Sequence, residues 1–281
     1  MKARSRFVLS TLAFGYAFLY VPLLLVVVYS FNDSRIATVW GGFSTRWYGE
    51  LFRNEQILTT AYLSLRIALT SATLATILGT MAGLAMARFG RFRGRTVFSG
   101  MITSPMVMPE VITGLSMLLL FVSLEQLLRF MFDWQFDRGV VTITIAHITF
   151  TMAYVTVVVQ SRLAGFDDSL EEAALDLGAR PAKVFFRITV PLILPAILSG
   201  WLLAFTLSWD DLVITQFVSG PGSNTLPMVI FSRVRLGVNP VVNALATLMV
   251  LIVALGVILS AVFMRRQEQR RKREEQMAVT G

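Results

Sequence analysis

SLEEAALDLGARPAKVFFRITVP, residues 169–191, is the stretch that decides the fold. It mixes charged and apolar residues although it lies between two long hydrophobic segments. Its apolar residues follow the i, i+3, i+4, i+7 spacing that gives a helix one apolar face, and Gly178 is a natural helix stop. The residues in that spacing are Leu170, Ala173, Ala174 and Leu177. The pattern predicts a water-facing amphipathic helix inside a membrane protein.

The composition of the chain argues for a membrane protein without chemistry of its own. Its 281 residues are 55% hydrophobic, a balance that soluble domains rarely reach. The absence of cysteine excludes disulfides, thiolate metal sites and cysteine nucleophiles, and a single histidine, His147, argues against a histidine metal centre. No lysine lies in a GxxxxGK[ST] loop. We therefore expect no catalytic residue, no metal ligand and no ATP site in this chain.

Six hydrophobic stretches each approach the roughly 20 residues that cross about 30 Å of hydrocarbon. They cover residues 7–31, 67–87, 96–124, 139–160, 192–215 and 240–264. The prediction is an all-α, polytopic membrane protein in which residues 1–281 form a single transmembrane domain with six transmembrane helices.

The segments around these stretches give further expectations. The apolar run after MKARSR is longer than a signal core and no small-x-small cleavage site follows, so an uncleaved first helix is expected. Residues 32–56 are suited to a short surface helix, and residues 217–240 to a surface or re-entrant hairpin. Gly79 and Gly83 form a small-xxx-small pair that can seat a helix crossing. His147, on an apolar span, is expected to be a hydrogen-bonded interior residue.

The basic residues predict the orientation. With the N-terminus inside, seventeen of the 25 lysine and arginine residues fall on the cytoplasmic side. Both termini are then cytoplasmic, together with the loop 161–190 and the basic tail 265–281. We therefore interpret the net charge of +8 as a signal for membrane orientation and for contact with lipid headgroups, and do not expect nucleic-acid binding.

The opening stretch also carries a spacing that resembles the cytoplasmic loop signature of ABC-importer permeases. The matching positions are Glu172-Ala173-Ala174, Gly178, Ile188 and Val190-Pro191, with valine where the family has leucine. The resemblance implies the type I importer permease architecture and a coupling helix that docks on a separate ATPase subunit. It implies that Glu172, Ala173, Ala174 and Gly178 carry this coupling, and that ATP and magnesium are bound by the partner. A plain solvated loop helix is the alternative.

Three carboxylates, Glu110, Asp210 and Asp211, lie where lipid or a pore must be. A charge there costs roughly 3 kcal/mol or more, so it usually faces a cavity or a partner. Glu110 and Asp210 are about 14 and 15 residues from the cytoplasmic ends of their spans. At 1.5 Å per residue, Glu110 lies roughly 21 Å from that end and Asp210 lies at a similar height. Phe205 and Trp209 add cation–π attraction of about 0.5–2 kcal/mol each. This set of five residues predicts a pathway for a cation. In the alternative, the acids pair with arginines: Arg66, Arg233 or Arg235.

Further segments resemble the putrescine and spermidine branch of these permeases, and the putrescine importers most closely. They include MPEVITGLS, SGWLLAFTLSWDDLVITQFVSGPGSNTLPM and GVNPVVNALAT. The branch typically has aspartate where Glu110 stands and leucine or phenylalanine where Trp209 stands. The resemblance implies an inner-membrane heterodimer with a second, similar permease. It also implies two ATP-binding subunits and a periplasmic polyamine-binding protein.

Two other functions stay open from the sequence. One is the same kind of machine for another solute, such as an amino acid, thiamine or an anion, although an anion pathway should lack the outer-half acids. The other is an ion-driven carrier or membrane enzyme that works alone, which predicts activity without a nucleotide-hydrolysing partner.

Overall fold

The computed structural model describes residues 2–36, 39–165, 169–237, 240–252, 254–255 and 258. All regular elements in these ranges are helices, apart from one isolated bridge between Asn32 and Phe43. The described residues up to Glu55 and from Ile230 onward form one compact unit, and Gln56–Val229 form a second. Five described helices are long and apolar enough to cross a membrane, and a sixth apolar helix is shorter.

The first unit holds α1 (Lys2–Tyr29), α2 (Arg46–Arg53) and the shorter apolar helix over residues 240–252. The short helix expected within 32–56 is present as α2, which buries Trp47 and Leu51, and its position on the membrane surface stays a prediction. The indole Nε1 of Trp47 donates to the carbonyl of Asn32 at 2.6 Å and so fixes the preceding loop. The predicted span 240–264 and the basic tail 265–281 extend beyond the described residues.

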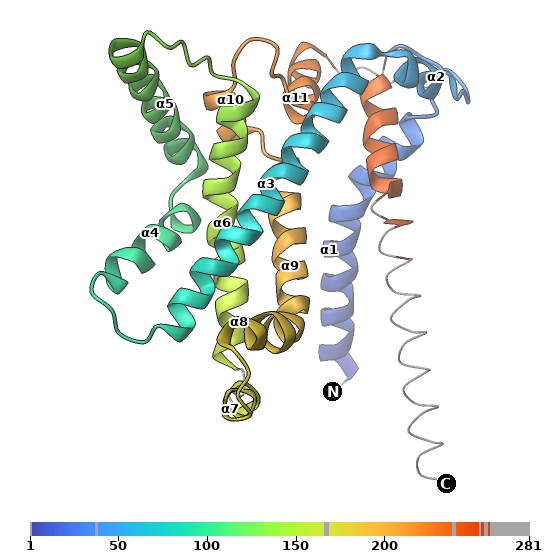
Figure 1. The fold of residues 1–281 in the computed structure, drawn as a ribbon. Helices are drawn as coiled ribbons and strands as arrows, with labels where there is room; N and C mark the ends of the chain where they lie inside the picture. Colours follow the sequence, from blue (N-terminus) through green and yellow to red (C-terminus); the bar gives the residue numbers. More distant parts are fainter. Residues whose placement is uncertain are drawn as a thin grey trace. The chain divides into compact units, whose positions relative to one another are not determined.

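The second unit holds most of the helices in Figure 1. Short loops connect them in chain order, and α7 and α8 lie together at one end of the unit (Figure 1). The helices are α3 (Glu55–Arg88), α4 (Arg95–Val107), α5 (Glu110–Phe132), α6 (Val140–Ala164), α7 (Ser169–Asp176), α8 (Pro181–Val184), the π-helical turn η1 (Phe185–Thr189), α9 (Val190–Trp209), α10 (Val213–Val218) and α11 (Leu226–Leu236), which continues past Val229.

Helix α6 is the centre of this unit because small residues let its neighbours approach closely. A Cβ on Gly79 of α3 would lie 2.7 Å from the Cβ of Val155, and one on Gly200 of α9 would lie 3.2 Å from a methyl group of the same valine. Gly83, one turn along α3, similarly meets Val159 at 3.2 Å. The predicted Gly79–Gly83 seam is thus confirmed, and a single buried valine separates two spans.

The predicted span 96–124 is not one helix. Met108 and Pro109 have extended backbone angles and separate α4 from α5, which differ in direction (Figure 1). Proline has no N–H to donate, and it disfavours helical angles in the residue before it. The expectation of an unbroken rise of 1.5 Å per residue from Thr96 to Glu110 was therefore wrong.

The predicted span 192–215 is interrupted as well. Helix α9 begins at Val190 and ends at Trp209, and α10 begins only at Val213. Beyond α10 the chain turns at residues 219–225 and continues as α11, so the segment 217–240 is broken by a turn as expected; its position in the membrane stays a prediction. Gly220 lies so close to the carbonyl of Arg138 that no side chain fits there.

Candidate substrate pathway and coupling site

Three aromatic side chains form a row along α9. Trp201, Phe205 and Trp209 recur every fourth residue, so they share one face of the helix. The first two rings stack with centroids 5.5 Å apart, and the last two with centroids 6.0 Å apart. Trp201 donates from Nε1 to the hydroxyl of Thr73 on α3 at 3.2 Å, which fixes one end of the row between two spans.

Asp210 lies at the other end of this row. It is the C-cap of α9, its backbone N–H donates to Thr206, and its side chain is exposed. The carbonyl groups at a helix C-terminus carry partial negative charge, which adds to that of the carboxylate. The exposed carboxylate and the stacked aromatic faces thus occur at the same end of α9, and both kinds of group attract an organic cation.

Asp211 is adjacent in sequence but has the opposite environment, because it is 8% exposed. Its Oδ2 accepts hydrogen bonds from the backbone N–H of Thr215 at 2.8 Å and from the Thr215 hydroxyl at 2.6 Å. Its Oδ1 accepts the N–H of Ile214 at 3.3 Å. These bonds satisfy backbone donors in the first turn of α10, so Asp211 stabilises the start of this helix after the break.

The same carboxylate faces His147 of α6. Nε2 of His147 lies 3.2 Å from Oδ2 of Asp211, and Nδ1 lies 2.7 Å from the hydroxyl of Ser208. The prediction of a hydrogen-bonded interior histidine is confirmed. Sequence reasoning missed Ser208 and Thr215, although both are polar residues within one turn of Asp211 along an apolar segment.

Glu110 comes from a different helix than the other two acids. It is the first residue of α5 and is exposed, where the positive end of the helix dipole favours its charge. One turn further, Gly114 packs against Phe217 and Ile214 of α10. Among the described residues, no arginine or lysine forms an ion pair within 4.0 Å with the Glu110 carboxylate.

The alternative in which Arg66 neutralises an acid has no contact to support it. Arg66 is exposed on α3, and within the described part of the second unit no ion pair links it to Glu110, Asp210 or Asp211. The described ranges also contain no group of three or more histidine, aspartate or glutamate side chains that could hold a metal ion.

The amphipathic stretch at residues 169–191 forms α7, the left-handed Gly178 with φ of +80°, and α8. The predicted helix and its glycine stop are both confirmed. Its apolar side chains remain uncovered: Leu170 is 53% exposed and Leu177 is 90% exposed. Glu172 and Ala173 are exposed and Ala174 is half-buried, so the motif presents an open face.

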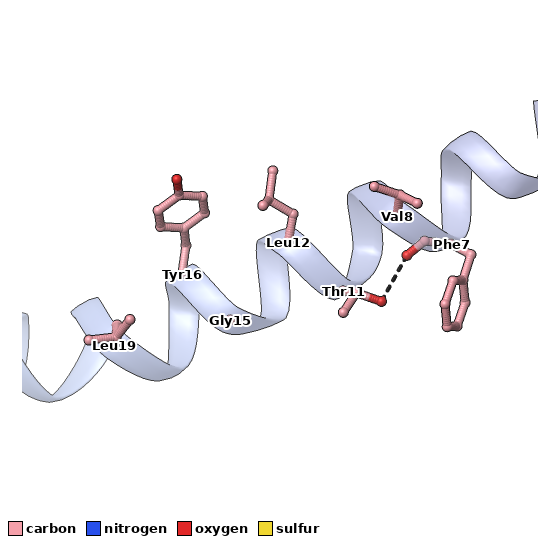
Figure 2. A pocket seen from close by; sticks show the side chains of 7 residues that line it. All are labelled: Phe7, Val8, Thr11, Leu12, Gly15, Tyr16 and Leu19. Atoms are coloured by element: carbon pink, nitrogen blue, oxygen red, sulfur yellow. Dashed lines mark hydrogen bonds between the residues drawn. The ribbon is translucent and has the colours of Figure 1, made fainter.

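A groove along α1 offers a contrast, because it has no polar character suited to a cation. Figure 2 shows that its lining comes from this one helix, with Leu12 and Tyr16 projecting from the same side. The hydroxyl of Thr11 donates to the carbonyl of Phe7 at 2.9 Å, and no lining residue is charged. This face suits a lipid chain or another apolar helix.

Comparison with known proteins decides the family. Residues 79–273 match the family model described as the binding-protein-dependent transport system inner membrane component. The chain belongs to this family. It is a multi-span permease subunit of ABC transport systems of the inner membrane, as the coupling-loop spacing predicted.

Two curated relatives and one solved structure are similar over most of the chain. The putrescine transport system permease protein PotI of Escherichia coli strain K12 is 56% identical over 278 residues, covering 99% of this chain and 98% of the relative. The spermidine/putrescine transport system permease protein PotC of Haemophilus influenzae is 44% identical over 251 residues, covering 89% and 93%. A bacterial alginate ABC transporter, solved in complex with an alginate pentasaccharide-bound periplasmic protein, shares the fold with a TM-score of 0.74, 16% identity and 94% coverage of both chains.

Proposed function

We propose that the chain is the permease subunit of an ATP-driven importer for polyamines, with putrescine as the preferred substrate and spermidine as a second one. The observation that carries the substrate class is the exposed Asp210 at the end of the aromatic row on α9. A polyamine is an apolar chain with ammonium ends. Aromatic faces suit the chain and each cation, and carboxylates accept the ammonium hydrogen bonds. The relatives named for putrescine and spermidine support the same class.

The residues of this pathway have different parts. Phe205 and Trp209 offer aromatic faces, Asp210 accepts an ammonium group, and Glu110 supplies a second carboxylate from α5. Asp211 fixes the chain that follows Asp210, because its oxygens are bonded to the first turn of α10 and to His147. The attraction is transient, since a tight site in a pathway would slow release.

ATP-driven movement enters through the open face of α7. Glu172, Ala173 and Ala174, with the bend at Gly178, would dock on an ATP-binding subunit that carries ATP and magnesium. The complete transporter would contain a second, similar permease, two ATP-binding subunits and a periplasmic polyamine-binding protein. Both termini would be cytoplasmic, which places α7 and the basic tail on the same side as the ATPase.

Reconstitution tests this function against its two rivals. The assembled transporter in proteoliposomes, supplied with binding protein and internal ATP, is expected to accumulate labelled putrescine. Labelled amino acid and thiamine serve as solute controls. Accumulation of either control solute in place of putrescine would contradict the substrate class. Accumulation driven by an ion gradient without ATP would contradict the importer and favour a stand-alone carrier.

A further inference from the structure

Glu171, the neighbour of the coupling residue Glu172, links three segments. Its side chain is 19% exposed, and one oxygen, Oε1, accepts two hydrogen bonds. One comes from Nη2 of Arg88 at 3.2 Å and the other from the hydroxyl of Thr189 at 2.6 Å. Arg88 is the last residue of α3, and Thr189 is the last residue of the π-helical turn η1.

Adjacent residues on a helix point about 100° apart, so Glu171 and Glu172 have different surroundings. Glu172 is exposed on the open face of α7, whereas Glu171 is directed into the protein. Both bonds of Glu171 are charge-assisted, because the acceptor is a carboxylate, and such bonds are roughly twice as strong as neutral ones. Helix α7 thus has one exposed acid, Glu172, and one acid bonded to the rest of the protein, Glu171.

The two segments that Glu171 contacts are both connected to the aromatic row. Residues Pro181–Trp209 form one continuous apolar helical run through α8, η1 and α9, so Thr189 lies on the same rod as Trp209. Helix α3, which ends at Arg88, contacts the row through Thr73 and Trp201. The π-helical turn is a rare element that is frequent at functional sites, and its last residue is the one that bonds Glu171.

We propose that Glu171 is a positioning residue that clamps α7 to the inner ends of α3 and α9, so that a displacement of the coupling helix moves both spans together. The proposal rests on the proposed function, in which α7 docks on an ATP-binding subunit. The carboxylate transmits motion without contacting either nucleotide or substrate. Its loss therefore separates ATP hydrolysis from transport and leaves assembly intact.

Thr189 offers a matched pair of variants for the first test. In the complete transporter in proteoliposomes, Thr189→Val removes the donor with little change in shape, and Thr189→Ser keeps it. We expect Thr189→Val and Glu171→Gln to raise the ATP hydrolysed per putrescine imported about tenfold, the size expected for losing a charge-assisted hydrogen bond. Thr189→Ser should leave this ratio unchanged. An equal ratio in Thr189→Val and Thr189→Ser would overturn the clamp.

A second measurement does not depend on the substrate. Because the chain has no cysteine, Arg91→Cys after α3 and Asp176→Cys on α7 give two unique, exposed label sites. The clamp predicts that the distance between the two spin labels is the same with ADP and with ATP. Once Glu171→Gln is added, the distance distribution with ADP should differ from the distribution with ATP. Identical distance distributions with and without Glu171→Gln would overturn the clamp. If the wild type hydrolyses ATP but imports no putrescine, the proposed substrate fails while the label distances still decide the clamp.

Discussion

At the residue scale, the neighbouring carboxylates of Asp210 and Asp211 have different roles, the first in the proposed substrate site and the second in holding the fold. Asp210 is exposed at the end of α9, whereas the side chain of Asp211 is buried and bonded to the start of α10. A buried carboxylate is tolerated only when its oxygens are satisfied, and Asp211 accepts three hydrogen bonds from two residues of α10. We therefore expect the same substitution, aspartate to asparagine, to affect uptake at Asp210 and stability at Asp211.

Asp210→Asn is expected to lower the rate of putrescine uptake about tenfold while leaving the amount of protein in the membrane unchanged. The amide keeps the shape but loses the charge that holds an ammonium group, and hydrogen bonds to charged groups are worth roughly 1.5–3 kcal/mol. Uptake of labelled putrescine at equal abundance measures this effect. Asp210→Glu keeps the charge and should retain most of the uptake. Full uptake by Asp210→Asn would remove the residue from the pathway.

Asp211→Asn should instead act on stability. The amide presents one oxygen in place of two to the donors of Ile214 and Thr215, and a buried group left without its partner costs about 1–3 kcal/mol. We expect a lower midpoint of thermal unfolding in detergent, and uptake that falls in proportion to abundance. A variant that unfolds like the wild type but imports no putrescine would place Asp211 in contact with the substrate.

At the scale of elements, the packing of α6 depends on the absence of side chains on its neighbours. Gly79→Ala is expected to destabilise the protein by about 1–3 kcal/mol, because the new Cβ would lie 2.7 Å from Val155 and 2.9 Å from the backbone oxygen of Met152. Thermal unfolding in detergent measures the loss. Gly100→Ala on α4 is the control, since nothing lies within 4 Å of its Cβ position. Equal stability of the two variants would contradict the close seam between α3 and α6.

The coupling helix makes a prediction of its own. Glu172→Lys reverses a charge on the open face of α7, where the Glu172 side chain is exposed and has no ion pair among the described residues. We expect normal abundance in the membrane, loss of co-purification with the ATP-binding subunit, and loss of uptake. Survival of both association and uptake would mean that α7 is a plain solvated helix.

At the scale of the whole molecule, periodicity and spacing predicted what depends on local patterns. Length and apolarity gave the helical membrane class, the i, i+3, i+4 pattern gave α7, and Gly79 and Gly83 gave the seam. Those signals are contained in single segments. They identify an element and its buried face without reference to the rest of the chain.

What the pattern missed depends on contacts between distant segments. The break before Glu110 was visible as Pro109, but hydropathy continues across it and concealed the end of α4. The inward direction of Asp211 is set by His147, which is 64 residues away, and that of Glu171 by Arg88, which is 83 residues away. No periodicity records such a partner, so adjacent acids looked equivalent until the fold separated them.

The measurement that tests the central claim most directly is uptake of labelled putrescine in cells that lack this gene, with and without its return. Spermidine and an amino acid are measured alongside. The proposed function predicts that putrescine uptake is lost with the gene and restored by the wild-type chain, while amino-acid uptake does not change. Putrescine uptake that is the same in the parental strain, the strain without the gene and the strain with the gene returned, in cells where no other importer takes up polyamines, would contradict it.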